Sequence, residues 1–458
     1  MFAIYRLLDY LKLQVMGKIW LILASFYFYA QGAKDFLPFF IGTVFFNYII
    51  GSTLVLTKDL KNRRVLLALG LVQNIGLLGY FKYANFFVQN YNILTGSDIS
   101  IGEIVLPIGI SFFTFQLIAY LIDCYRGETK EYSVVDYLLF ITFFPQLIVG
   151  PIVHHKDVVP QFEFEKQSIF SLEKFLLGLF IFSIGAAKKV MIADPLTSYG
   201  KLFFANVSEY GLLDAWLSTF AYTFSYYFDL SGYADMAIGM GYLFNIKLPE
   251  NFNSPYKARN FREYWRRWHM TLSKFLSDYI FRSVYKKGDK SLKFYFAIIV
   301  TFLVSGFWHG AGWQFIVWGI VNGIFVSMAH FMYRKGWSLP LYLAWLLTFA
   351  GVLGTRVLFV SKGLKGALRS YEKLFSFSSF IELNRGNILF ETGKFLAYNS
   401  YTLLILIVAM GIAFFAKNTM EIAENFTLKY RYAFAIGVLL AITLVQMTVV
   451  SDFLYFQF

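Results

Sequence analysis

His309 is the residue whose type and surroundings most clearly suggest chemistry. It lies in the segment SGFWHGAGWQFIVWG, within a stretch (294–333) that contains no Asp, Glu, Lys or Arg. An ionisable side chain in so apolar a segment is energetically unfavourable and therefore indicates a functional site. Burial favours the neutral imidazole, which can accept a proton from a substrate hydroxyl as a general base. The structural alternative is a histidine that only forms hydrogen bonds between helices.

Glycines on both sides of His309 predict a break in the helix that carries it. Gly306, Gly310 and Gly312 weaken a regular helix and allow close backbone approach. Irregular backbone at membrane depth is tolerated only where it is buried in protein or lines a cavity. We therefore expect His309 to lie beside a tunnel, and the stretch 294–333 to make two passes with a break between them.

A second histidine, His269, lies in the basic and aromatic segment RNFREYWRRWHMTLSKFLSDYIFR, which starts at residue 259. On a helix, spacings of four, three and four place Arg262, Arg266, His269 and Ser273 on one face. Apolar side chains fall on another face: Trp265, Trp268, Leu272, Phe275 and Tyr279. We predict one amphipathic helix at the membrane interface, with arginines on lipid phosphates and tryptophans in the aromatic belt. His269 is then either catalytic or a solvated interfacial residue.

Two carboxylates occur in another apolar run, YTFSYYFDLSGYADMAIGMGY. Asp229 and Asp235 are six residues apart, with Ser231 and Gly232 between them. Carboxylates at membrane depth are unfavourable unless they are paired or line a cavity. We expect a broken or re-entrant segment, in which these side chains either bind substrate or cap a helix and hold helices together.

The remaining reactive residue types indicate no metal site. His154 and His155 are adjacent in a loop, and no carboxylate or cysteine cluster accompanies them. The single cysteine, Cys124, excludes an intramolecular disulfide and multi-cysteine metal sites. The chain contains no G-x-S-x-G, no Walker A pattern, no H-E-x-x-H and no G-x-G-x-x-G, so nothing supports a serine hydrolase or a nucleotide hydrolase.

The elements that must position these residues are membrane-spanning helices. Of the 458 residues, 58% are hydrophobic and 15% are charged, whereas soluble domains carry about 25% charged residues. A membrane-spanning helix needs roughly 20 mainly apolar residues. Candidate runs occupy most of the chain: 19–33, 36–56, 65–81, 104–122, 137–153, 175–193, 212–228, 233–244, 294–331, 339–360, 401–416 and 432–450. The sequence therefore predicts an all-α polytopic membrane protein that forms one domain over residues 1–458.

The positive charge is concentrated in one region. The formal net charge is +13, and residues 247–293 contain twelve Lys or Arg and four Asp or Glu. In a membrane protein this excess indicates positive-inside loops and contact with anionic lipid rather than binding of nucleic acid. Two further basic loops, 58–64 and 126–130, are assigned to the cytoplasm on the same basis. The first apolar run is not followed by a cleavage pattern, so we expect an uncleaved helix.

Together these segments resemble the membrane-bound O-acyltransferase superfamily, in particular the bacterial branch that contains the alginate O-acetyltransferase membrane component and the peptidoglycan O-acetyltransferases. The resemblance covers nearly the whole chain. Its blocks are LILASFYFYA, KYANFF, LPIGISFFTFQ, YLIDCYRGE, GPIV, YFDLSGYADMAIG, PENFNSPY, WRRWHMTLS, FWHGAGW and FLYFQF, in this order. After LSDYIF a PLGG-like turn is expected of the alginate type, but RSVYKKGDKS stands there.

The resemblance implies about a dozen helices around a central funnel and tunnel, and transfer of an acyl group from a cytoplasmic thioester to an extracytoplasmic hydroxyl. His309 matches the catalytic histidine of the superfamily, and His269 matches the second histidine of the branch. Acetyl-CoA is the implied donor. We list further candidates for substrate or donor binding: Arg262, Arg266, Asp229, Asp235, Asn253 and Trp308.

The implied function is acetyl transfer in the bacterial cytoplasmic membrane to a cell-envelope polysaccharide, with peptidoglycan ahead of alginate. An extracytoplasmic transferase of the SGNH-hydrolase type is the expected partner. D-alanyl transfer to teichoic acid is one alternative, because WHM also resembles that branch. A transporter or flippase that binds an ion or a lipid-linked sugar at a broken helix is another, and a scaffold that recruits a soluble transferase is a third.

Overall fold

Every regular element of the computed structural model is a helix in the residues that the structure describes, 1–162, 170–376, 396 and 398–447. Six helical segments in these residues are long and apolar enough to cross a membrane: Gln14–Leu56, Leu60–Thr95, Leu172–Ala205, Ser291–His309, Trp313–Arg334 and Leu341–Val360. Two shorter apolar helices are Ser400–Phe415 and Tyr430–Gln446. The predicted all-α polytopic membrane fold is confirmed. The FLYFQF motif (453–458) lies outside the described residues.

The chain divides into two compact units, 1–179 with 237–249, and 180–236 with 250–458. The prediction of one domain over the whole chain therefore stays a prediction. Two helices contribute residues to both units, α11 (Leu172–Ala187) and α13 (Leu212–Leu243).

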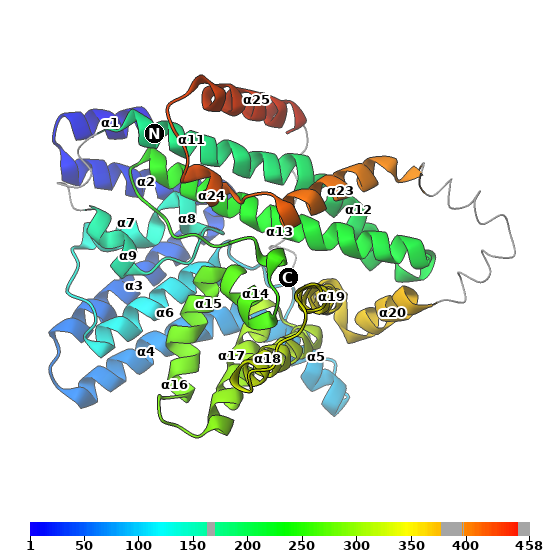
Figure 1. Ribbon diagram of the computed structural model, residues 1–458. Helices are drawn as coiled ribbons and strands as arrows, with labels where there is room; N and C mark the ends of the chain where they lie inside the picture. Colours follow the sequence, from blue (N-terminus) through cyan, green and yellow to red (C-terminus); the bar gives the residue numbers. More distant parts are fainter. Residues whose placement is uncertain (163–169, 377–395, 397, 448–458) are drawn as a thin grey trace, which may run out of the picture. The chain divides into compact units, whose positions relative to one another are not determined.

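Within the described residues, the first unit is built mainly from helices of the N-terminal part of the chain. These are α1 (Phe2–Tyr10), α2 (Gln14–Ala33), α3 (Leu37–Leu56), α4 (Leu60–Leu78), α5 (Ala84–Thr95), α6 (Ile110–Arg126), α7 (Val134–Thr142), α8 (Phe144–Leu147) and α9 (His155–Val158). In Figure 1, α3, α4 and α6 lie side by side. Gly51 and Gly70 allow this packing, because a Cβ at either position would overlap Tyr120 or Leu121 of α6.

The second unit contains the helices that carry both candidate histidines. After α12 (Asp194–Ala205) and most of α13 come α14 (Phe261–Arg267), α15 (Met270–Leu276), α16 (Arg282–Val284), α17 (Ser291–His309), α18 (Trp313–Arg334), α19 (Leu341–Val360), α20 (Gly363–Phe375), α23 (Ser400–Phe415), α24 (Thr419–Ala423) and α25 (Tyr430–Gln446). In Figure 1, α17 and α18 lie side by side and α14 packs near them.

The break predicted in the stretch 294–333 is confirmed. Helix α17 ends at His309 and α18 begins at Trp313, with Gly310 and Gly312 in extended backbone between them. The two helices pack closely because Gly306 and Gly319 face each other's backbone: a Cβ at Gly306 would overlap the carbonyl oxygen of Phe315, and one at Gly319 that of Phe302. Small residues allow this approach between membrane helices.

The single amphipathic helix predicted around His269 is wrong. Helix α14 ends at Arg267, Trp268 is extended, and His269 adopts left-handed backbone angles (φ 46°, ψ 52°) before α15 starts. The break is stabilised by Asn251, whose Oδ1 accepts hydrogen bonds from the backbone N (3.2 Å) and Oγ1 (2.9 Å) of Thr271. This side chain satisfies backbone donors at the start of α15, as an N-terminal cap would.

The broken segment predicted around Asp229 and Asp235 is also wrong, because both residues lie in the continuous helix α13. Helix α11 and the π-helical turn that follows it, Lys188–Ala193, make this possible in two ways. Lys188 and Lys189 pair with the carboxylates, and Gly185 of α11 lies against Gly232 of α13. A Cβ at Gly185 would stand 2.6 Å from the Gly232 carbonyl oxygen, so the two backbones are in close contact.

Candidate active site

His309 lies at the C-terminal end of α17 with 6% of its surface exposed. Three aromatic rings surround the imidazole, with centroids at 4.8 Å (Trp308), 5.2 Å (Trp318) and 5.1 Å (Phe359). The imidazole also lines a small cavity of about 20 Å³. A cavity of this size holds about one water-sized group. His309 therefore lines a small cavity, while the predicted tunnel beside it and its catalytic role stay predictions.

The same cavity contains a residue that the sequence reasoning missed, Arg356 of α19. Its guanidinium carbon lies 4.1 Å from the ring centroid of Tyr226, 5.3 Å from that of Trp268 and 5.4 Å from that of Phe359. Only 5% of Arg356 is exposed. It is the one charged residue in the run 339–360, and an intramembrane charge is itself a sign of function.

A second cavity, of about 330 Å³, adjoins α14, α15, α17 and α18. Arg262, Arg266 and Ser273 line it, as does His330. The Arg262 guanidinium lies 3.8 Å from the ring centroid of Tyr333. Of the four residues predicted to share one helix face, Arg262, Arg266 and Ser273 line this cavity and His269 does not, and two helices rather than one provide them.

Trp265 is common to both cavities. Its ring contacts Trp318, which lines the small cavity, at 5.7 Å and Phe302, which lines the large one, at 5.1 Å. The indole ring of Trp265 therefore belongs to the walls of both the larger, basic cavity and the His309 cavity.

His269 does not share the face of Arg262 and Arg266, because its left-handed backbone turns the chain at this point. Its Nδ1 lies 3.2 Å from Oδ1 of Asn251, and its ring centroid is 5.8 Å from that of Phe252. Burial lowers the pKa of His269 to about 3, so the imidazole is neutral at physiological pH. His269 is not among the residues that line either cavity.

Asp229 and Asp235 form buried ion pairs with consecutive lysines. Lys189 Nζ lies 2.7 Å from Oδ1 of Asp229 and 2.7 Å from Oδ1 of Asp194. Lys188 Nζ lies 2.6 Å from Oδ2 of Asp235. These contacts favour the alternative in which the carboxylates hold helices together, because each charge has a partner that offsets its loss of hydration.

Asn253 and Trp308, the two other candidates for substrate or donor binding, lie in different surroundings from each other. Asn253 accepts a hydrogen bond from Nδ2 of Asn418 at its Oδ1 (3.1 Å), and its backbone pairs with that of Arg267. Trp308 is buried and packs beside the His309 ring. Asn253 therefore links α24 to the segment before α14, whereas Trp308 helps to hold the catalytic candidate in place.

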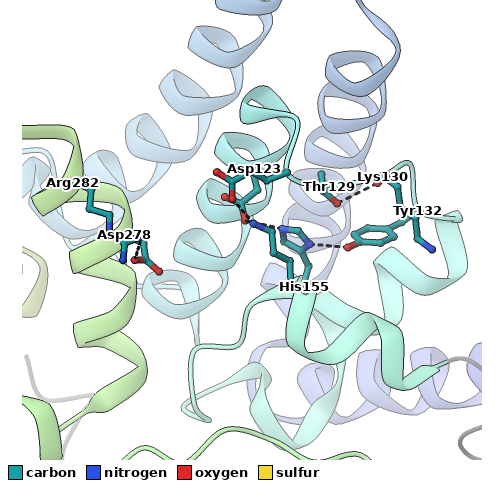
Figure 2. Close-up of polar contacts among 9 residues, drawn as sticks. Asp123, Thr129, Lys130, Tyr132, His155, Asp278 and Arg282 are labelled. Carbon is teal, nitrogen blue, oxygen red and sulfur yellow. Dashed lines mark hydrogen bonds and ion pairs between the residues drawn. The ribbon is translucent and has the colours of Figure 1, made fainter. Parts of the chain in front are cut away.

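A separate buried network occurs in the first unit. As Figure 2 shows, His155 lies between Asp123 and Tyr132: its Nε2 is 3.0 Å from Oδ2 of Asp123 and its Nδ1 is 2.8 Å from the Tyr132 hydroxyl. Lys156 Nζ approaches the same Asp123 oxygen (3.1 Å) and also Glu128. Burial opposes the charge on Lys156, but these two carboxylates outweigh it and raise its pKa. Among the described residues, no group of three or more His, Cys, Asp or Glu has the arrangement of a metal site.

Residues 66–338, which include both candidate histidines, match the model of the membrane-bound O-acyltransferase family. A peptidoglycan O-acetyltransferase of Helicobacter pylori is 37% identical over 98% of this chain and 93% of its own length. A probable alginate O-acetylase of Pseudomonas aeruginosa is 39% identical over 83% of this chain and 74% of its own length.

A more distant relative covers less of the chain. The teichoic acid D-alanyltransferase of Bacillus subtilis is 30% identical over 49% of this chain and 59% of its own length. The family resemblance inferred from the sequence is confirmed by the family match and by the two relatives that cover most of the chain. This polytopic protein belongs to the membrane-bound O-acyltransferase family.

Proposed function

We propose that this enzyme transfers an acetyl group from acetyl-CoA to a hydroxyl of a cell-envelope polysaccharide, with peptidoglycan preferred to alginate. The observation that carries the mechanism is the buried His309 in a cavity next to the larger, basic one. The preference for peptidoglycan rests on the H. pylori relative, which matches over nearly the full length of both chains. The D-alanyltransferase matches over about half of this chain, which favours acetyl over D-alanyl transfer.

The reaction that fits this site is direct transfer from the thioester to an acceptor hydroxyl, which belongs to the polysaccharide or to the partner transferase that delivers the acetyl group to it, without an acyl intermediate on this chain. His309 takes the proton of the acceptor hydroxyl, and the hydroxyl oxygen adds to the thioester carbonyl carbon. When the tetrahedral adduct collapses, the carbon–sulfur bond breaks and the proton on His309 passes to the thiolate. Holding donor and acceptor together supplies much of the rate enhancement, because a reaction between two molecules becomes one within a complex.

The larger cavity is the proposed entrance for the donor. Arg262 and Arg266 carry the positive charge that the phosphates of coenzyme A require, and 330 Å³ is within the usual range of small-molecule sites. The enzyme would lie in the bacterial cytoplasmic membrane, receive acetyl-CoA from the cytoplasm, and pass acetyl groups to the polysaccharide through an extracytoplasmic transferase of the SGNH-hydrolase type. In this arrangement the acyl group crosses the membrane and the coenzyme does not.

Release of coenzyme A from radiolabelled acetyl-CoA tests the proposal. Purified protein in proteoliposomes should release coenzyme A when a peptidoglycan fragment and an envelope extract are present, and His309→Ala should lower the rate by at least about 100-fold, the usual contribution of a general base. If folded His309→Ala protein releases coenzyme A at the same rate as the parental protein, then the assignment of His309 as the catalytic base is wrong. Flux of a lipid-linked sugar without loss of thioester would instead indicate the transporter alternative.

The same assay tests the donor site. Arg262→Gln and Arg266→Gln should raise the KM for acetyl-CoA by roughly tenfold each, since each removes a charged contact to phosphate of about 1.5 kcal/mol. Arg369→Gln is the matched control, because Arg369 is exposed on α20. Equal KM values in all three variants would place the coenzyme elsewhere.

A further inference from the structure

Arg356 is a buried cation in the His309 cavity that the proposed mechanism leaves unused. Only 5% of its surface is exposed. Aromatic rings surround its guanidinium, and the hydroxyls of Tyr226, Tyr256 and Tyr264 also interact with it. Contacts with aromatic rings and neutral hydroxyls offset only part of the cost of taking an ion out of water. Among the described residues, no Asp or Glu lines the cavity to neutralise the guanidinium, so this cation requires a further reason.

Two residues that line the cavity each carry a buried nitrogen donor with no hydrogen-bond partner within the described residues: Nε of Arg356 and Nε1 of Trp265. A buried donor without an acceptor is energetically unfavourable. Two such donors at one cavity indicate that a hydrogen-bond acceptor occupies the cavity during catalysis. The cavity of about 20 Å³ has room for one water-sized acceptor such as a carbonyl oxygen.

The rings around Arg356 hold its guanidinium in position. Tyr226, Trp268 and Phe359 come from α13, the α14–α15 junction and α19 itself. Phe359 also contacts the His309 ring, with a distance of 5.1 Å between centroids. One set of packed rings therefore fixes both the candidate base and the cation. Such preorganisation is what makes fixed charges effective in stabilising a transition state, since no reorientation is needed during the reaction.

Resting on the function proposed above, we propose that Arg356 and the Trp265 indole N–H stabilise the oxyanion that forms on the acyl carbonyl oxygen. When the acceptor oxygen bonds to the carbonyl carbon, the C=O electron pair moves onto that oxygen, and the negative charge lies against the guanidinium. When the carbon–sulfur bond breaks, the pair returns to the C=O bond and the sulfur takes the proton from His309. Arg356 lies beyond residues 66–338, the segment that matches the family model.

A carboxylate on the acceptor is the other anion that this site would attract. The two sources differ in what they require of the acceptor. The oxyanion forms with every hydroxyl acceptor, and also when water attacks the thioester. A carboxylate contact would matter only for acceptors that carry one. Acetyl transfer to a neutral oligosaccharide and simple thioester hydrolysis therefore distinguish the two sources.

The experiment uses full-length protein in proteoliposomes with Arg356→Gln, Arg356→Lys and Trp265→Phe, and with Arg369→Gln as the exposed control. We expect Arg356→Gln to lower kcat by about 100-fold to 1,000-fold with the KM for acetyl-CoA nearly unchanged, the usual effect of losing an oxyanion donor. Arg356→Lys should keep more activity than Arg356→Gln, and Trp265→Phe, which retains the ring, should lose about tenfold. Free guanidinium ion should partly restore Arg356→Gln.

Thermal unfolding of each variant shows whether the fold is intact, and only variants within a few degrees of the parent are compared. The proposal is wrong if folded Arg356→Gln retains the parental kcat, or if it slows only carboxylated acceptors and leaves hydrolysis and neutral acceptors unchanged. It is also wrong if Arg356→Lys and Arg356→Gln lose equal activity and free guanidinium ion does not restore Arg356→Gln. Parental protein that releases no coenzyme A in any condition would instead contradict the proposed function, so the two failures are distinguishable.

Discussion

His269 has two unusual properties: a left-handed backbone conformation and a buried, neutral imidazole. Only a few per cent of residues other than glycine have positive φ, and such positions often lie at functional sites. In this protein the strained residue separates Arg266, in the wall of the larger cavity, from Thr271, whose backbone N bonds to Asn251. The geometry assigns His269 a part in shaping the site, and a direct part in the chemistry stays a prediction.

The low pKa of His269 predicts how stability depends on pH. The pKa is about 3 in the folded protein and 6.5 ordinarily, because burial disfavours the imidazolium. Between these values the unfolded chain binds more protons than the folded one, so acid favours unfolding. The stability that the folded protein gains from keeping His269 neutral is fully present above pH 6.5. It falls, by at most about 1.4 kcal/mol per pH unit, as the pH is lowered towards 3.

Thermal unfolding in detergent at pH 7.5 and pH 5.5 measures this contribution. Parental protein should lose more stability between the two values than His269→Asn, because asparagine tolerates the left-handed backbone and does not titrate. The difference between the two proteins isolates His269 from other titrating groups. Identical losses would mean that His269 is not a buried neutral group.

At the scale of helices, the close packing of α17 on α18 places His309. Gly319 is the critical contact, since a Cβ there would overlap the Phe302 carbonyl oxygen. We expect Gly319→Ala to separate the helices, to cost about 1 to 3 kcal/mol of stability, and to lower acetyl transfer by at least tenfold. Gly411→Ala on α23 is the matched control, because a Cβ at Gly411 meets no atom within 4 Å.

The measurement is paired for each variant: the unfolding midpoint in detergent and the rate of coenzyme A release. If Gly319→Ala and Gly411→Ala behave alike in both, then the glycine contact does not position His309. If activity falls by more than the loss of stability accounts for, then displacement of the histidine, rather than partial unfolding, is responsible.

At the scale of the molecule, the structure supports placing the two basic loops of the first unit at one end of that unit. Arg63, in the first turn of α4, donates from its Nη2 to the carbonyl oxygen of Cys124 (3.0 Å) near the end of α6. The basic segments 58–64 and 126–130 are therefore neighbours. The continuous helical segment Leu60–Thr95 is long enough to carry the chain to the opposite face before Ser100.

Cysteine labelling tests this topology. In a Cys124→Ser background, Lys61→Cys and Lys130→Cys should both react with a membrane-impermeant maleimide from the cytoplasmic side, and Ser100→Cys from the other side. All three native residues are exposed, and Cys124 is buried, so the parental cysteine contributes little signal. Labelling of Lys61→Cys and Lys130→Cys from opposite sides would contradict the assignment.

The fold class and the principal histidine could be predicted from the sequence alone. Runs of about 20 apolar residues have few alternatives to a membrane helix, because the bilayer interior offers the backbone no hydrogen-bond partners. His309 stood out because a charged or ionisable residue is rare in such a run, and the glycines around it predicted the break that separates α17 from α18.

The positions of the other polar residues depended on contacts between helices distant in the sequence. Helical spacing predicted that His269 would share a face with Arg266, but Asn251, 20 residues before Thr271, stabilises a break between them. Asp229 and Asp235 stay within a continuous helix because lysines about 40 residues earlier in the chain neutralise them. Arg356 acquires its place beside His309 through packed rings from three elements. Local sequence determines which segments form helices, since helical hydrogen bonds are local; tertiary structure decides which buried charges meet and which face one cavity, since those energies depend on partners that only folding brings together.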